Sequence, residues 1–366
     1  MDKVALDAFM VNWMRTHDHG ILPGAMLMNY GPEDYIGATL AVRGTLYFRG
    51  ACTEGVREAI CACFDQYEAI AKGHLTWLWR EEPPEGPNRI AYSKAKSMRE
   101  MLAGMDENAH VGFAYIGGKK SHDASPWLFW VSGLRAWEVK MGRRALDSLQ
   151  FSVPRQFVED NPTAFQALFV AFARLLKAEH GHAGFAFNLS IVRKRANEST
   201  EAAMVSKMAG LDAGSAVLVG RSDEIGIADH IKTVGWLTAI NTSMVHAVGG
   251  VPALRSELPR DWFANYDYGN GIVIQAGPEP EIASVELDPK PAIYVLPNMA
   301  LQAIRIARID SLHSGSVDGE PRLAGASAER WLRRFDVPPD ELLRFKAKLL
   351  DEPKLTPETT LHNLQG

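Results

Sequence analysis

The chain of 366 residues has few cysteines and no long apolar run. Its three cysteines, Cys52, Cys61 and Cys63, form no CxxC pair and are odd in number, so the sequence favours neither a zinc scaffold nor a disulfide framework. The longest apolar runs, such as residues 127–131, fall far short of the roughly 20 residues that cross a bilayer. Apolar residues near the start are spaced as in a helix rather than contiguous. We therefore expect no signal peptide, no membrane contact and a cytoplasmic location.

The chain also carries little net charge: its formal net charge is −5 and its isoelectric point is near 6.1. A nucleic-acid binder must neutralise several phosphates with lysine and arginine, so this balance argues against direct nucleic-acid binding. A mildly acidic surface better suits a basic protein partner. Hydrophobic residues make up 46% of the chain, which is ample for a sizeable core in one two-lobed unit or about two domains.

The first 144 residues predict alternating strands and helices. A segment rich in β-formers indicates a strand over 39–48, and Thr53 is placed to cap a helix that runs to about Lys72 and ends at Gly73. The remaining elements predicted for this half are strands over 74–79, 111–116 and 127–131 and a short helix over 93–103.

The second half repeats this order of elements. Pro162 stands in the first turn of a predicted helix with apolar residues at helical spacing, and Gly181 is expected to end that helix. The other predicted elements are strands over 145–153, 185–189, 234–240 and 272–274 and a helix over 198–208. The shared order predicts an α+β fold of two fused lobes, residues 1–144 and 145–310, with mixed or antiparallel sheets packed by helices.

The composition changes after residue 310. Residues 311–327 are rich in Ser, Gly and Ala and predict a linker, and helices are expected near 328–335 and 339–350. Residues 311–366 are therefore predicted to be a linker with a C-terminal helical arm. The last helix carries several leucines, so we expect it to dock on the main body, with dimerisation or partner binding as the alternative.

A distinctive segment, residues 267–278, predicts a hairpin-like turn followed by a buried strand. Gly269, Asn270 and Gly271 suit the positive φ angles of a tight turn. The following β-branched run, residues 272–274, indicates the strand, and Gln275 places one polar group inside it.

Two His-x-His motifs, His17 with His19 and His180 with His182, are the main metal signal. On a strand this spacing would put both imidazoles on one face, where zinc or another divalent ion could be held. Because Gly181 is expected to end a helix, His180 and His182 need not share a face. We therefore predict no metal site and keep a metal-dependent hydrolase that uses these four histidines as an alternative.

No complete catalytic set is apparent elsewhere. His122, Asp123 and Ser125 offer a base, an acid and a hydroxyl, but no Gly-x-Ser-x-Gly elbow surrounds the serine, and a capped Ser-Pro turn accounts for these residues. Residues 117–121 resemble a phosphate-binding loop only superficially, because the first glycine is missing from the required spacing. The sequence therefore predicts no catalytic residues, no cofactor and no enzymatic activity.

Two acidic segments are candidates for partner binding. One lies in a Pro-rich loop and the other follows the strand near 274 without any basic residue before 290. Such loops can steer and plug a basic cleft such as a nuclease site, and a plain solvated loop is the alternative. The candidate partner-binding residues are Glu81, Glu82 and Glu85 in the first segment and Glu279, Glu281, Glu286 and Asp288 in the second.

Several ordered motifs resemble the type VI secretion immunity family known as TsiV-like. They include Ser-Pro-Trp-Leu-Phe at 125–129, Gly-Trp-Leu-Thr at 235–238 and Gly-Ile-Val-Ile-Gln-Ala-Gly at 271–277. The passages from 63–67 to 75–79 and from 165–168 to 180–184 are also similar to that family. The resemblance spans about residues 39 to 300.

The resemblance implies a bacterial immunity protein that binds and neutralises a cognate type VI effector. Members accompany VRR-NUC and related nuclease effectors, so the implied partner is a DNA-cleaving toxin domain in the cytoplasm. Neutralisation would be stoichiometric, by occlusion of the active site or the DNA channel. The shared motifs are of a structural kind, so no contact residue is transferred from the family. An adaptor of the secretion system, recruited through the C-terminal helices, is the remaining alternative.

Overall fold

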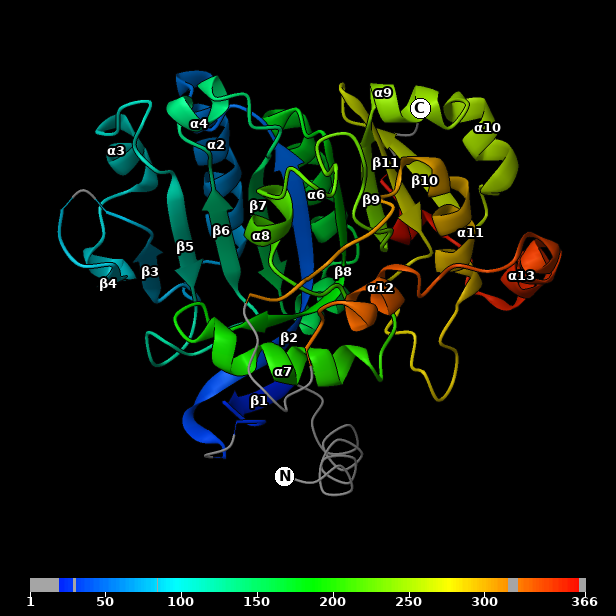
Figure 1. Ribbon diagram of the computed structural model, residues 1–366, viewed down its shortest axis with the longest axis horizontal. Helices are drawn as coiled ribbons and strands as arrows, with labels where there is room; N and C mark the ends of the chain where they lie inside the picture. Colours follow the sequence, from blue (N-terminus) through cyan, green and yellow to red (C-terminus); the bar gives the residue numbers. More distant parts are fainter. Residues whose placement is uncertain (1–19, 29–30, 84, 315–321, 362–366) are drawn as a thin grey trace.

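The computed structural model describes residues 20–28, 31–83, 85–314 and 322–361 (Figure 1). Its centre is one antiparallel sheet in the strand order β10-β11-β9-β8-β2-β7-β6-β5-β3-β4, with β1 paired to β2 beside this path. The strands are β1 Ile21–Gly24, β2 Glu33–Phe48, β3 Trp77–Arg80, β4 Arg89–Ala91, β5 Gly112–Ile116, β6 Leu128–Ser132, β7 Asp147–Val153, β8 His180–Leu189, β9 Leu237–Asn241, β10 Phe263–Asp267 and β11 Gly271–Ala276.

Helices cover both faces of this sheet. In Figure 1, α2 and α6 lie behind it, while α7, α8 and α12 lie in front. The helices are α2 Glu54–Ile70, α3 Met98–Ala103, α4 Ala136–Lys140, α5 Arg155–Asp160, α6 Ala164–Leu176, α7 Lys194–Val205, α8 Ala216–Gly220, α9 Thr242–Ala247, α10 Gly250–Glu257, α11 Ala292–Ala300, α12 Ala326–Leu332 and α13 Leu342–Lys348. Within the described ranges, no helix combines the length and the apolar character that crossing a membrane requires.

The face of the sheet under α2 and α6 holds an aromatic core. Gly44 of β2 stands directly opposite Phe151 of β7, and a Cβ atom at position 44 would lie 2.7 Å from the Phe151 ring. Glycine is therefore required there for close approach. The Phe151 ring packs against Phe165 and Phe172 of α6, with centroids 5.0 and 4.8 Å away. Each fully buried ring of this kind contributes roughly 1.5–3 kcal/mol through burial.

The opposite face of the same strands is polar. On β2, Thr45 stands opposite His182 of β8, and Tyr47 stands opposite His180. Directly opposed residues share a face, so both imidazoles point toward the layer that contains α7 and α8. Arg43 of β2, at 5% exposure, is thus buried between the sheet and the helices rather than solvated.

The β10–β11 hairpin confirms the predicted turn and buried strand. Gly269 adopts a φ of 89°, and the Tyr268 amide donates to the Gly271 carbonyl across the turn. Inside the strand, the Gln275 amide is fully satisfied: it accepts from the Tyr266 hydroxyl and donates to the carbonyls of Gly277 and Thr359. A buried amide with every group paired does not destabilise the strand.

Gly181 is where the prediction from sequence is wrong. The helix α6 ends at Lys177, which takes the left-handed conformation with a φ of 47°. Gly181 lies inside β8, and a Cβ there would come within 2.5 Å of the Thr45 carbonyl oxygen on the neighbouring strand. The glycine therefore permits close strand contact instead of ending a helix. By contrast, Gly73, with a φ of 83°, lies in the turn just after α2, close to the predicted end.

The C-terminal arm is packed into the body. Trp331 and Leu332 of α12 join the main hydrophobic core, while Phe345 and Leu349 join a second core built around β9–β11 and α11. The predicted docking of the last helix on the main body is confirmed. The predicted α+β class with antiparallel strands is also confirmed. The boundaries proposed at 144 and 310 stay a prediction, and the sheet itself continues across residue 144 through the β2–β7 pairing.

Candidate functional site

The first acidic segment follows β3 and lines a cleft of about 610 Å³ between α3, β5 and the loop 81–87. The Arg80 guanidinium donates to the carbonyls of Glu85 and Pro87, at 2.9 and 2.7 Å, and so holds the loop closed on itself. Apolar side chains form much of the cleft wall, and lysines stand at its rim. These residues are Ile90, Met101, Met105 and Phe113, with Lys94 and Lys96.

Two of the three candidate carboxylates in this segment are engaged by cations or donors. The Oε2 atom of Glu81 lies 3.1 Å from Nε2 of the buried His110. Arg221 approaches Nδ1 of the same ring and can only donate, so Nε2 carries the proton given to Glu81. This hydrogen bond holds the pKa of Glu81 below its ordinary value. Glu82 forms an ion pair with Arg135. Among the described residues, Glu85 has an exposed carboxylate with no ion-pair partner.

The second acidic segment, residues 278–289, follows β11 and precedes α11. Its backbone is fixed by the neighbouring segment 207–210: Ala209 and Gly210 donate to the carbonyls of Ala283 and Ile282, at 2.9 and 2.8 Å. The Val285 amide donates back to the Lys207 carbonyl at 2.9 Å. These hydrogen bonds order the backbone of the connection within the fold itself.

Within this segment the carboxylates divide into two kinds. Glu281 accepts from the Ala283 amide at 3.0 Å, and Asp288 pairs with Lys348 of α13 at 2.5 Å. Glu279 and Glu286 are exposed and have no ion-pair partner in the part of the chain that the structure describes. Beside Glu286, the Leu287 side chain is 89% exposed.

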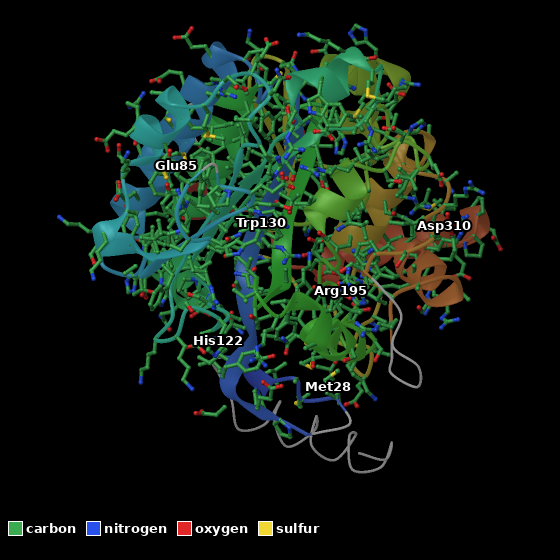
Figure 2. All side chains as sticks on the ribbon, turned by 60° about the vertical axis from the view of Figure 1, so that its left-hand side comes forward. Met28, Glu85, His122, Trp130, Arg195 and Asp310 are labelled. Atoms are coloured by element: carbon green, nitrogen blue, oxygen red, sulfur yellow. The ribbon has the colours of Figure 1, made fainter. Side chains whose placement is uncertain are left out.

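The two acidic segments lie at opposite corners of the sheet. Each of the seven pairings from β11 to β3 is antiparallel, so these two strands run in opposite directions. The segments follow the carboxyl ends of β3 and β11. Because these strands run in opposite directions, the two segments leave the sheet at opposite ends of its strands. Figure 1 shows β3 and β11 toward opposite sides of the molecule, and Figure 2 labels Glu85 of the first segment. The candidate residues thus form two surfaces, and their contact with a toxin stays a prediction for each.

The structure also places two of the four candidate metal ligands. His180 and His182 share one face of β8, contrary to the expectation from Gly181, and are 0% and 2% exposed. Nε2 of His180 donates to the Ile227 carbonyl at 2.8 Å, and burial lowers the pKa of His180 to about 3. His17 and His19 lie outside the described residues. Among those that are described, no three His, Cys, Asp or Glu side chains are grouped to hold a metal ion.

A buried charge cluster around Asp212 was missed by the sequence analysis. Lys232 Nζ and Arg43 Nη2 lie 2.5 and 2.9 Å from its carboxylate. His182 Nε2 lies 3.1 Å from the same carboxylate. Burial opposes ionisation of Asp212, but the surrounding cations hold its pKa well below the ordinary range. These residues are far apart in sequence, and the one local signal was Arg43 inside a β-forming run.

This cluster is enclosed within the fold, since Asp212 and Lys232 are only 6% and 1% exposed. The adjoining cavity, lined by Arg43 and Trp130, has a volume of about 20 Å³, close to that of one water molecule. Trp130, labelled in Figure 2, lies near the centre of the molecule. A second buried pair joins Glu201 of α7 to His313 at 2.8 Å and ties residues near the arm to the same layer. Chemistry on a substrate would require access that these groups do not have.

A family model described as type VI immunity for VRR-NUC matches residues 59–335. The chain belongs to the TsiV family. A solved structure titled as the Pseudomonas aeruginosa T6SS protein PA0821 is 47% identical, with a TM-score of 0.93, and the alignment covers 98% of this chain and 99% of that one. The comparison with curated proteins gives no match.

Membership of the TsiV family makes this chain a type VI immunity protein. That role favours binding over catalysis and implies an effector nuclease as the partner. The family resemblance inferred from the ordered sequence motifs is therefore confirmed.

Proposed function

We propose that this TsiV-family protein binds its cognate type VI effector in the cytoplasm and neutralises it by stoichiometric occlusion. The effector is a DNA-cleaving nuclease, and the immunity protein covers its active site or the channel that admits DNA. The family match over residues 59–335 carries the proposal. No cofactor, catalytic residue or direct contact with nucleic acid is part of this mechanism.

The geometry supports inhibition by binding. The buried charges of Arg43, Asp212 and Lys232 are paired with each other. Two surface carboxylates, those of Glu279 and Glu286, are presented on a fixed loop. A nuclease attracts DNA through lysine and arginine side chains. Carboxylates placed on a rigid loop can compete for the same cationic surface and accelerate the encounter.

Co-expression with a candidate effector nuclease, sought first among the neighbouring genes, tests the proposal. Cells that express the toxin alone are expected to stop growing, and cells that also express this protein are expected to grow. With purified components, DNA cleavage should fall linearly as the immunity protein is added and should stop at a fixed molar ratio.

A catalytically inactive toxin provides the matched control, because its complex can be isolated without damage to the cells. It should elute with the immunity protein as one species on size exclusion. Continued cell death together with separate elution would rule out the proposed function. Inhibition at amounts far below the toxin concentration would instead indicate catalysis and contradict the stoichiometric mechanism.

A further inference from the structure

The tip of the second acidic segment presents an aliphatic side chain to solvent. Leu287 is 89% exposed and Val285 is 46% exposed, although both are apolar. Single exposed apolar residues are common and need no explanation by themselves. At this position, however, the apolar side chain is combined with a fixed backbone and with a specific charge pattern.

The backbone under this tip is fixed by hydrogen bonds on both sides. The amides of Leu287 and Asp288 donate to the Ser284 carbonyl, at 3.1 and 2.9 Å, and close one helical turn. Met208 and Ser284 form an isolated antiparallel bridge, and the Glu281 amide donates to the Tyr294 hydroxyl at 2.9 Å. Because the turn is already ordered, binding through Leu287 has a small entropic cost.

The charge around this tip differs from the charge around Leu343, another exposed leucine. Leu287 is flanked in sequence by Glu286, which has no ion-pair partner among the described residues, and by Asp288, which pairs with Lys348. Leu343 on α13 is 77% exposed but has charges of both signs beside it, with Glu341 before it and Arg344 after it. An exposed apolar residue beside the unpaired carboxylate of Glu286 fits an apolar hollow with a cationic rim, which is the complement expected of a surface that binds DNA phosphates.

We propose that Leu287 is the anchor of the toxin interface and that Glu279 and Glu286 guide the toxin onto it. The partner surface would be an apolar pocket, edged by lysine or arginine, on the nuclease domain of the cognate effector. This inference rests on the proposed immunity function and names the contact residues of that function. The two kinds of residue are expected to act on different rate constants. Charges mainly raise the association rate constant, and a buried apolar contact mainly lowers the dissociation rate constant.

The test measures the binding kinetics of the full-length protein on the immobilised, catalytically inactive toxin. Replacement of an interface anchor typically costs enough affinity for a roughly 30-fold change. Leu287→Ala should therefore dissociate roughly 30-fold faster than wild type, with little change in its association rate. The side chain is exposed in the free protein, so thermal unfolding should be unaffected.

Leu343→Ala is the matched control, because it also shortens a largely exposed leucine on the same protein. It should leave both rate constants unchanged. Dissociation of Leu287→Ala within twofold of wild type would overturn the proposal, and so would an equal effect of Leu343→Ala. Light scattering of the free proteins gives a further check, because a change of mass in Leu287→Ala would assign the tip to contact with a second copy and overturn the toxin contact.

These outcomes are distinguishable from failure of the proposed function. If wild type binds and protects but Leu287→Ala behaves identically, the immunity function stands and the assigned anchor is wrong. If the wild-type protein neither binds the toxin nor protects cells, both the proposed function and the assignment of Leu287 as the anchor are wrong. Faster dissociation of Leu287→Ala with weaker protection of cells supports both.

Discussion

The two acidic segments differ in which candidate carboxylates lack an ion-pair or hydrogen-bond partner among the described residues: Glu85 in the first segment, and Glu279 and Glu286 in the second. In the loop after β3, Glu81 accepts from His110 and Glu82 pairs with Arg135, so their charge is largely used within the fold. In the segment after β11, Glu279 and Glu286 have no ion-pair partner among the described residues. The number of carboxylates in a loop therefore does not decide how much charge the loop offers to another protein. Their local partners decide it.

The two segments also differ in the surface to which they belong and in the charges near them. The first segment lines the large cleft, whose rim carries Lys94 and Lys96 as well as glutamates. The second segment presents an exposed leucine, Leu287. A cationic toxin surface would be attracted more strongly to the second, because mixed charges at the cleft rim partly cancel.

The largest effect is expected from neutralisation of the second segment. The double variant Glu279→Gln with Glu286→Gln should associate with the inactive toxin about 10-fold more slowly at low salt. The difference should shrink toward 1 M salt, where the Debye length falls to about 3 Å. Stopped-flow association measured over a salt series gives both the rate and its salt dependence.

Glu82→Gln with Glu85→Gln is the matched variant, because it removes the same number of charges from the first segment. We expect less than a twofold change in its association rate. If this pair slowed association as much as the pair in the second segment, the contrast between the segments would be wrong. The cleft would then have to be included in the toxin interface.

A smaller effect concerns the stability that Glu81 contributes. Its hydrogen bond from His110 lowers its pKa from an ordinary value near 4.5. A carboxylate whose pKa is lower in the folded than in the unfolded state stabilises the fold at pH values above its unfolded-state pKa. That stabilisation is lost as the pH falls through the folded-state pKa. Because the side chain is 34% exposed, the contribution at pH 7 should be no more than about 1 kcal/mol.

Glu81→Gln should therefore lower the free energy of unfolding at pH 7 and have little effect near pH 3, as measured by urea denaturation. Glutamine keeps an acceptor for His110, so the comparison isolates the charge. Glu85 has no ion-pair partner among the described residues, so Glu85→Gln should leave the free energy of unfolding unchanged at both pH values. Equal destabilisation by the two variants would contradict the assigned role of Glu81.

Local patterns predicted much of the fold. The strand predicted over 39–48 lies within β2, and the helix predicted from Thr53 corresponds to α2. The hairpin at 267–278 was also recognisable, because glycine placement and β-branched residues act over a few positions. In contrast, α11 was missed, since it is apolar and buried along most of its length and carries Pro297 inside it, which is atypical of a helix.

The candidate site was less predictable because partners come from distant segments. Sequence identified the carboxylates of both acidic loops, but Glu81 meets a histidine 29 residues away and Glu82 an arginine 53 residues away. Gly181 shows the same limitation, since its role is set by the Thr45 carbonyl on another strand. The pairing of strands across the sheet decides which polar groups find hydrogen-bond partners. Composition alone does not specify that pairing.

The smallest effect should come from turning a partnered carboxylate of the second segment into a free one. Lys348 pairs with Asp288 at 2.5 Å, and both side chains are partly exposed, so the pair contributes about 0.5 kcal/mol or less to stability. Lys348→Ala should therefore leave unfolding nearly unchanged and raise the rate of toxin association, by no more than about twofold at low salt. Lys140→Ala is the control, because it frees Glu107 near α4, away from this segment. A rate increase with Lys348→Ala alone would show that the second segment attracts the toxin through its unpaired carboxylates, and the same increase with both would reduce the effect to net charge.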